Sequence, residues 1–429
     1  EVSRIVESVT GGRSIPGELL ERITERTDGV PLFVEGLTKT VLEADVLKED
    51  DEHYVLAGPL PELSVPATLH DSLIERLDRL APVKEVAQTA ACIGRTFLPE
   101  LLAHVLPQVQ ADLDHALDQL VDAELMFRHG AGAQTSYSFK HALVRDAAYE
   151  SVLLSKRQQV HSRIAEALKE GPSNEPELVA QHYTAANLPE EAIPCWMAAG
   201  RRALAGSNLV EANAHFARAL GQTSKIESPS DQAATELDVR TALGTAKMAL
   251  FGWPAPEVRD VIETACDLFE QGHGTSEAFM NLWNLWLHHG CRAEHIDGLA
   301  IIERMLKHAD AHKDPTMSLV SSFAASMANL WVGNYPEALK HETRALELYD
   351  FQRDKDLVWN YNHDPKNTLL SWASFRVWAL GYPDQARTLS DEALAHAREV
   401  DHAFNLCWTL GNSSIALGLC GDFDKSRAR

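Results

Sequence analysis

The sequence lacks the motifs with which enzymes commonly hold phosphate groups or carry out acid–base chemistry. It contains no GxxxxGK[ST] loop and no GxGxxG segment after a predicted strand. The segment from Gly11 to Ser14 resembles a phosphate loop only superficially, because no hydrophobic strand precedes it and no lysine follows it. We find no nucleophile–base pair and no paired carboxylates, so the sequence predicts no catalytic residue in this chain.

Positive charge is also scarce. The chain has 62 acidic and 39 basic residues and a formal net charge of −23. Its densest basic cluster, Lys156-Arg157 with Arg163 nearby, is small. Because an acidic surface repels phosphate groups at long range, we expect neither a nucleic acid nor an anionic membrane as a partner.

Cysteine pairs and long apolar runs are missing as well. The six cysteines are scattered without a CxxC pair, which predicts reduced thiols in a cytoplasmic protein rather than a disulfide framework. The longest uncharged run, Ala403 to Gly421, contains two asparagines and three glycines, so we expect no membrane span. The chain starts without methionine inside an expected helix and stops within a repeat, and we therefore expect a fragment of a longer protein.

Most of the sequence shows the periodicity of amphipathic helices, and Gly, Pro or Asn residues separate one predicted helix from the next. One segment differs. From Leu125 to Phe139, two runs of large apolar and aromatic residues flank a glycine-rich turn, which predicts a β-hairpin. Helices followed by a hairpin indicate a winged-helix module. The helices expected before the hairpin are Pro66–Leu80, Pro82–Ile93, Leu98–Leu106 and Ala111–Glu124.

The helix before the hairpin argues against DNA binding, although many winged helices place this helix in the major groove. It carries five carboxylates and no lysine or arginine; the acidic residues are Asp112, Asp114, Asp118, Asp122 and Glu124. Facing DNA, they would oppose the electrostatic attraction that supplies most of the binding. We interpret the predicted wing as structural.

A repeated pattern begins at about residue 175. Three segments, Gly333–Leu346, Gly381–Leu394 and Gly421–Arg429, place an aromatic residue within two positions of a glycine and a small residue five positions after it. With more degenerate copies, turns are predicted at 207, 252, 290, 333, 381 and 421, which are 38 to 48 residues apart. Tetratricopeptide repeats have a period of about 34 residues and related repeats reach the forties. We predict stacked helix pairs of tetratricopeptide character that form a right-handed superhelix with a concave inner face.

Aromatic residues are concentrated in these predicted repeats. In NLWNLWLHHGCRAEH, three histidines and Cys291 follow two tryptophans, but their spacing matches no closed zinc site, so we predict no metal here. Exposed aromatic side chains are favoured as binding anchors. The candidates for a partner-binding groove are Trp283, Trp286, Trp331, Trp359 and Trp378.

Three long stretches resemble one protein family. GVPLFVEGLTKTVLE, GPLPELSVPATLHDSLIERLDRLAPVKEVAQTAACIGRTF and YSFKHALVRDAAYESVL are similar to bacterial multidomain class III adenylate/guanylate cyclases. Those proteins carry a cyclase domain, then an ATPase domain of the STAND type (signal-transduction ATPases with numerous domains, an AAA-like branch), then tetratricopeptide repeats. The resemblance continues through QHYTAANLPEEAIPCW and residues 362–386, so it covers nearly the whole chain.

The resemblance implies a mostly α fold in three modules. Residues 1–62 would be the helical lid of the ATPase domain, residues 63–170 a winged-helix-like module with one small β-hairpin, and residues 175–429 a repeat array truncated at its C-terminus. The phosphate loop, the metal-binding acidic strand and the cyclase domain lie upstream of Glu1 in such proteins. ATP or ADP and Mg²⁺ are thus implied for the full-length protein, and no cofactor for this chain alone.

The resemblance also implies two nucleotide contacts. The Gly29-Val30-Pro31 element matches the family element that places its proline near the nucleotide base. His141 matches, more loosely, a winged-helix histidine that senses the inner phosphates of bound ADP. A histidine that merely begins a helix is the alternative for His141.

The implied function is regulation in cyclic-nucleotide signalling. The lid and winged helix would clamp ADP in a closed state, and a protein partner in the repeat groove would favour an open, ATP-bound or oligomeric state. Two alternatives stay open. One is a STAND-type transcriptional regulator that ends in a DNA-binding domain, and the other is a tetratricopeptide scaffold that binds peptides.

Overall fold

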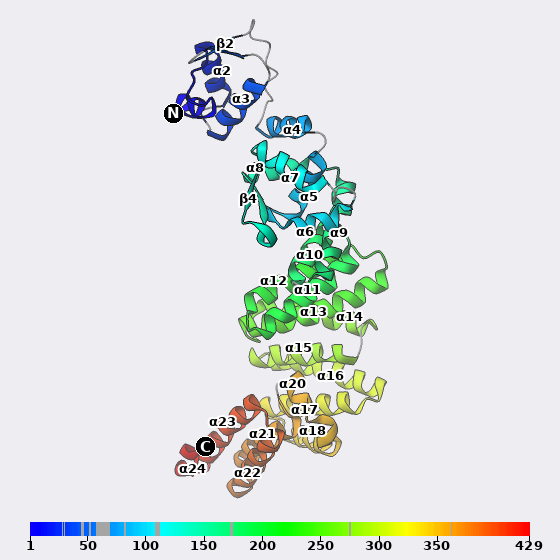
Figure 1. Ribbon diagram of the computed structural model, residues 1–429. Helices are drawn as coiled ribbons and strands as arrows, with labels where there is room; N and C mark the ends of the chain where they lie inside the picture. The colour runs from blue at the N-terminus through cyan, green and yellow to red at the C-terminus, as the bar shows by residue number, and fades with distance from the viewer. Residues whose placement is uncertain are drawn as a thin grey trace. The chain divides into compact units, whose positions relative to one another are not determined.

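The computed structural model describes residues 1–429 except positions 28, 30, 44–46, 51–52, 57–68, 81–82, 108–111, 172–174, 274–275 and 362. The described chain is mostly α-helical, as the sequence predicts, and its strands are short (Figure 1). It divides into two compact units, Glu1–Ala192 and Ile193–Arg429. No described helix is both long and apolar enough to cross a membrane.

The first unit combines two groups of helices with two small sheets. The predicted helix starts at Pro66, Pro82 and Ala111 lie outside the described residues. Its elements are α1 (Val2–Val9), α2 (Gly17–Thr27), α3 (Pro31–Glu43), β1 (Leu47–Asp50), β2 (His53–Leu56), α4 (Leu69–Arg79), α5 (Lys84–Ile93), β3 (Thr96–Phe97), α6 (Pro99–Val105), α7 (Leu113–Asp122), β4 (Met126–His129), η2 (Gly132–Gln134), β5 (Ser136–Phe139), α8 (Ala142–Glu150), α9 (Leu154–Glu170) and α10 (Pro176–Ala185).

The predicted hairpin between Leu125 and Phe139 is present as β4 and β5, paired antiparallel with Met126 opposite Phe139. A third strand, β3, completes the sheet by pairing with the other edge of β5, so that the strand order is β3-β5-β4. The inner side chains of this sheet, including Phe97, Tyr137 and Phe139, join the core formed by α4, α5, α6, α7 and α8. Helices covered on one side by a three-stranded sheet form the predicted winged-helix arrangement.

A second hairpin, β1 paired antiparallel with β2, was not predicted from the sequence. Its strands read LKED and HYVL, and their described side chains are exposed or only half-buried. The usual signal for a strand is alternation between a buried and a solvated face. Because this hairpin buries little apolar surface, that signal is nearly absent from its sequence.

The second unit is built from helices alone among its described residues. Helix α11 (Pro189–Ala205) contains the division between the units, and the module boundaries predicted at 62, 170 and 175 stay predictions. The following elements are α12 (Leu209–Thr223), α13 (Pro229–Phe251), α14 (Pro256–Glu270), η3 (Ser276–Phe279), α15 (Met280–Cys291), α16 (His295–His312), α17 (Pro315–Trp331), α18 (Tyr335–Leu348), α19 (Phe351–Asp354), α20 (Leu357–Tyr361), α21 (Pro365–Ala379), α22 (Pro383–Val400), α23 (Ala403–Leu419) and α24 (Phe423–Ala428).

Left-handed residues close the turns between paired helices. The predicted turn positions 207, 252, 333, 381 and 421 all have positive φ, between 60° and 92°. After Gly333, the Asn334 amide donates to the Asn329 carbonyl at 2.8 Å, and Tyr382 and Asp422 repeat this bond after Gly381 and Gly421. Such a bond around a left-handed residue is the Schellman way of ending a helix. Figure 1 shows the resulting helix pairs, such as α17 with α18 and α21 with α22.

Small residues let the paired helices approach one another. Ala338 and Ala345 of α18, and Ala386 and Ala393 of α22, are each at most 1% exposed. These are the positions that the repeated pattern marks as small. A larger side chain at any of them would push the two helices of its pair apart. The repeated small residues in the sequence therefore mark the positions where paired helices are in close contact.

The predicted turn at Gly290 is wrong. Gly290 lies inside α15, and the left-handed residue that ends this helix is Ala293 (φ 60°). The glycine serves packing instead, because a Cβ atom added to it would lie 2.6 Å from Cζ3 of Trp331. Its missing side chain allows the Trp331 ring to rest on α15.

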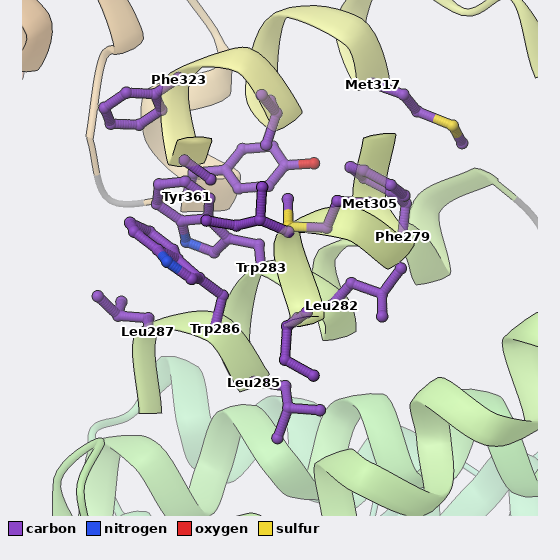
Figure 2. Close-up of a cluster of buried hydrophobic side chains, with 14 of the residues drawn as sticks. Phe279, Leu282, Trp283, Leu285, Trp286, Leu287, Met305, Met317, Phe323 and Tyr361 are labelled. Carbon is purple, nitrogen blue, oxygen red and sulfur yellow. The ribbon is translucent and has the colours of Figure 1, made fainter. Parts of the chain in front are cut away.

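The largest buried cluster of the second unit surrounds α15. Trp283 and Trp286 project from this helix beside Tyr361 and Phe323 (Figure 2). The ring centroid of Trp283 lies 4.7 Å from that of Trp286, 5.0 Å from Phe323 and 5.4 Å from Tyr361. Aromatic rings each bury a large area and prefer offset or edge contacts at such separations. This cluster therefore holds α15, α17 and α20 together.

Replacing Gly290 by alanine is expected to destabilise the repeats by about 1–3 kcal/mol, because the added methyl group overpacks against Trp331. Gly411 provides a matched control. It also lies inside a helix, α23, but is exposed and has no atom within 4 Å of an added Cβ. Gly411→Ala should stabilise the protein by up to about 1 kcal/mol through helix propensity. Chemical denaturation followed by circular dichroism measures both, and equal effects would contradict the packing role of Gly290.

Candidate functional site

The Gly29–Pro31 element lies where two helices of the first unit meet. Helix α2 ends at Thr27, Gly29 has a φ of +69°, and Pro31 is the exposed first residue of α3. Val30 lies outside the described residues. A glycine with positive φ after one helix and a proline at the start of the next are both ordinary helix-end chemistry. The local structure therefore explains these two residue types without a ligand.

His141 is the N-cap residue of α8 and immediately follows the last residues of the wing. Its backbone is extended (φ −133°, ψ 147°), and its side chain makes no capping hydrogen bond. The Nε2 atom is buried and has no hydrogen-bond partner among the described residues. A buried nitrogen without a partner is unfavourable, which fits a group whose partner is a ligand.

Four charged residues join the predicted lid to the winged helix, and we call Glu35, Lys39, Glu124 and Lys140 the lid–wing ion network. Lys140 Nζ lies 3.2 Å from Glu35 Oε1 and 3.1 Å from Glu124 Oε2. Lys39 Nζ lies 3.0 Å from Glu35 Oε1 and also bonds Glu124. Each lysine thus contacts both carboxylates. Because Glu35 and Lys39 come from α3, the network couples this helix to the wing.

Two residues of the lid–wing ion network lie close in sequence to the candidate nucleotide contacts. Glu35 lies one helical turn after Pro31, and Lys140 directly precedes His141. The network therefore brings the segments of both candidate nucleotide contacts to the same junction, although the sequence separates them by more than a hundred residues. It was not predicted from the sequence, since only the fold places Glu124 beside α3.

The charges of the network are balanced, which limits what it offers to a phosphate group. Hydrogen bonds from Lys39 and Lys140 lower the pKa of Glu124 from 4.5 to about 2. Burial alone would raise the pKa of Glu35, but hydrogen bonds from the same two lysines outweigh burial and lower it. With both lysines paired to carboxylates, the network itself leaves no unpaired cation for a phosphate group.

The network is expected to weaken in acid. The pKa of Glu124 is lower in the folded protein than in the unfolded chain, so its contribution to stability is full above pH 4.5 and is lost as the pH falls toward 2. Because the side chain is 51% exposed, we expect no more than about 1 kcal/mol. Denaturation of wild type and Glu124→Gln between pH 7 and pH 3 should give a stability difference that shrinks with acid. Asp122→Asn, an exposed carboxylate on α7, is the control, and a pH-independent difference for Glu124→Gln would contradict the assignment.

The acidic helix before the wing keeps its charge at the surface. Asp112, Asp114, Asp118 and Asp122 are all exposed on or beside α7. Arg128 Nη1 of β4 lies 3.7 Å from Asp118 Oδ1. The face that would meet a DNA groove in other winged helices therefore carries mostly negative charge, which disfavours contact with phosphates.

A pocket of about 200 Å³ lies in the second unit, among the aromatic residues of the helix pairs. Its walls come from α15, α17, α21 and α23 and from the segments before α14 and α21. Nearly all of the lining is apolar, and six tryptophans contribute to it. We call it the aromatic pocket; its lining residues are Trp253, Trp283, Trp286, Leu287, Gly290, Cys291, Phe323, Met327, Trp331, His363, Thr368, Trp372 and Trp408.

The predicted groove tryptophans divide between this pocket and other places. Trp283, Trp286 and Trp331 line the pocket. Trp359 is 69% exposed and its ring meets that of His402 edge-on at 4.4 Å. Trp378 donates from Nε1 to the Leu419 carbonyl at 3.0 Å. The structure thus gathers three of the five candidates, and whether any of them contacts a partner stays a prediction.

Three further tryptophans of the pocket, Trp253, Trp372 and Trp408, were not among the candidates. They come from different helix pairs and lie up to 155 residues apart in the sequence. The sequence signal for them was only the general concentration of aromatic residues in the repeats. A pocket built from several pairs has no local pattern from which it could be recognised.

Two of the three histidines of the NLWNLWLHHGCRAEH segment have separate structural partners. His288 Nδ1 lies 2.7 Å from the Trp253 carbonyl oxygen, and His289 Nδ1 lies 2.9 Å from Glu294 Oε2. His289, Glu294 and Asp297 offer ligand atoms within 4.8 Å of one another. Arg292 also donates to Glu294 at 2.7 Å, so this carboxylate already balances a cation. This grouping carries no metal assignment.

Comparison with known proteins adds limited information. No family model matches the chain. An uncharacterized protein of Rhizobium meliloti (strain 1021) is 25% identical over 415 residues, which cover 94% of this chain and 39% of that protein. The chain therefore spans about two fifths of the length of that relative.

Among solved structures, the chain is similar to the Signal Transduction ATPase with Numerous Domains (STAND) protein with a tetratricopeptide repeat sensor from Pyrococcus horikoshii. The match covers 100% of this chain and 65% of that chain, at 12% identity and a TM-score of 0.37. A similarity this weak carries no argument about function. The conclusions on the site therefore depend on its own residues.

Proposed function

We propose that this chain is the regulatory part of a cytoplasmic signalling ATPase of the STAND type, linked to a class III adenylate/guanylate cyclase. In this proposal the lid and winged helix respond to the bound nucleotide, and the helix pairs bind a protein partner. ATP or ADP and Mg²⁺ are held mainly by segments upstream of residue 1. The sequence resemblance suggests these roles, and the geometry of the first unit supports them.

The observation that carries the proposal is the lid–wing ion network. A nucleotide-responsive clamp needs the lid and the winged helix to approach each other at the ligand. The network joins them one turn after Pro31 and one residue before His141. The Nε2 atom of His141, the residue after Lys140, is buried and has no partner among the described residues. A change of bound nucleotide would weaken or strengthen this junction. The chain would then have two states that differ in their affinity for the protein partner.

Removal of the His141 side chain tests the nucleotide role. In the full-length protein, we expect His141→Ala to weaken ADP binding about tenfold or more, since a hydrogen bond to a charged group contributes about 1.5–3 kcal/mol. His115→Ala is the control, because His115 is an exposed residue of α7. Isothermal titration with ADP measures both. Equal affinities of wild type and His141→Ala would contradict the proposed contact.

Catalytic activities separate the remaining parts of the proposal. The full-length protein should make a cyclic nucleotide from ATP or GTP, and failure to do so would refute the cyclase linkage while leaving nucleotide sensing open. Purified residues 1–429 should hydrolyse no ATP and bind nucleotide weakly, because the chain has no phosphate loop. Turnover by this chain above background would contradict the assignment directly.

A further inference from the structure

The aromatic pocket has the properties of a small-molecule site. We propose that it binds a small neutral aromatic molecule that carries one hydrogen-bonding group, of the phenol or indole class. This inference goes beyond the proposed function and does not depend on it, since it concerns binding to the repeats alone.

The walls consist of rings that hold one another in place. Trp286 and Trp331 stack in parallel, with centroids 5.3 Å apart and planes 3° from one another. Trp372 meets Trp331 edge-on at 6.4 Å, and Trp283 stacks on Phe323 at 5.0 Å. Because each ring is fixed by its neighbours, the pocket is formed before a ligand arrives. Preformed apolar walls with aromatic side chains are typical of small-molecule sites.

Two lining residues each carry a buried polar atom that has no partner among the described residues. These atoms are Nδ1 of His363 and Oγ1 of Thr368, in side chains that are 8% and 3% exposed. A buried polar atom without a hydrogen bond is unfavourable. A ligand with one hydroxyl or ring N–H group would relieve part of this cost. The two atoms lie in neighbouring parts of the chain, just before and within the first turn of α21.

The character of the lining excludes other ligand classes. The lining residues include no lysine or arginine to pair with an anion and no carboxylate to pair with a cation, which would find only the faces of the tryptophan rings. Burial lowers the pKa of His363 to about 4, and its ring is therefore neutral at pH 7. A sugar would bring several hydroxyl groups to a lining that offers few polar atoms, and would leave most of them without partners. A neutral ring with one polar group matches the lining.

The size of the pocket sets the size of the ring. A cavity of about 150 Å³ lined by apolar side chains can bind benzene. At about 200 Å³ the aromatic pocket has room for one substituted or fused ring system. It lies below the volume of about 300–1,000 Å³ that is usual for drug-sized ligands. Phenol and indole fit this range, and a large cofactor does not.

The first test compares probes on the wild-type chain by isothermal titration. Phenol and indole should bind, and toluene, which has the ring without a polar group, should bind about fivefold more weakly, which corresponds to a net hydrogen bond of about 1 kcal/mol. Glucose should show no binding, and tetramethylammonium should bind more weakly than phenol because it would have only ring faces as partners. Failure of all the aromatic probes to bind would overturn the proposal, as would tighter binding of tetramethylammonium or glucose.

The second test removes the polar atoms while keeping the shape of the pocket. Thr368→Val and His363→Phe should each be measured with phenol and with toluene. At least one of them should weaken phenol binding about fivefold and leave toluene binding unchanged. Thr388→Val is the control, because Thr388 is an exposed residue of α22 outside the pocket. If neither variant lowers the preference for phenol over toluene, the assignment of the hydrogen bond is wrong.

Discussion

Replacement of Asp364 by alanine is expected to lower the unfolding free energy by about 3–5 kcal/mol. Asp364 is fully buried, and its Oδ1 accepts a hydrogen bond from the Asn367 amide at 2.7 Å, which caps α21. The same carboxylate accepts from the Tyr349 hydroxyl at 2.8 Å and lies 3.0 Å from His396 Nε2. Loss of a cap costs about 1 kcal/mol, and each buried group left without a partner about 1–3 kcal/mol more.

A second N-cap aspartate separates these contributions. Asp314 caps α17 by accepting from the Met317 amide at 2.8 Å, and it is only half-buried. Asp314→Ala should therefore cost only about 1 kcal/mol, the value of the cap. Chemical denaturation of both variants gives the comparison. If Asp364→Ala costs no more than Asp314→Ala, then the contacts of Asp364 with Tyr349 and His396 do not stabilise the fold as we expect.

Replacement of Trp283 by alanine is the second large effect that we expect. This side chain is 2% exposed and contacts Trp286, Phe323 and Tyr361. Its removal should destabilise the second unit by about 3–5 kcal/mol, because the remaining rings cannot fill the space that it leaves. Thermal unfolding followed by near-ultraviolet circular dichroism would report the loss of the aromatic cluster.

Trp359 is the matched control for this change. The sequence placed Trp283 and Trp359 in the same group of candidates, but Trp359 is 69% exposed. Trp359→Ala should change the stability by no more than about 0.5 kcal/mol, as is usual for surface substitutions. Similar losses in the two variants would show that Trp283 is not the centre of the buried cluster.

The repeat architecture was predictable because its turns have a local cause. A left-handed residue followed by a specific backbone bond ends α17, α21 and α23, and glycine is the residue that adopts this conformation most readily. Gly333, Gly381 and Gly421 were correctly placed for this reason. Gly290 was misplaced because a glycine can equally serve a close contact, here with Trp331, and one sequence does not distinguish the two uses.

The candidate sites were less predictable than the helices. The lid–wing ion network depends on Glu124, which looked like one more carboxylate of an acidic helix and instead contacts Lys39 and Lys140. The aromatic pocket depends on tryptophans from several helix pairs. In both cases the contacts join residues that are far apart in the sequence. The periodicity and spacing of residues in a sequence indicate only contacts between residues that are close along the chain.

Asp364 also has a role that could not be predicted from the sequence. The His-Asp-Pro segment at positions 363–365 belongs to the stretch, residues 362–386, that continues the family resemblance. In the structure Asp364 caps α21 and makes buried hydrogen bonds, and Pro365 is the first residue of this helix. His363 faces the aromatic pocket. A single motif therefore combines a structural residue with one that we assign to ligand binding.

The most direct test of the central claim is hydrogen exchange of the full-length protein with and without ADP. The claim is that α3 and the segment around His141 respond together to the bound nucleotide. We predict that ADP slows amide exchange both in residues 31–43 and in residues 139–145, where the lid–wing ion network joins them. Unchanged exchange in both segments at saturating ADP would contradict the account.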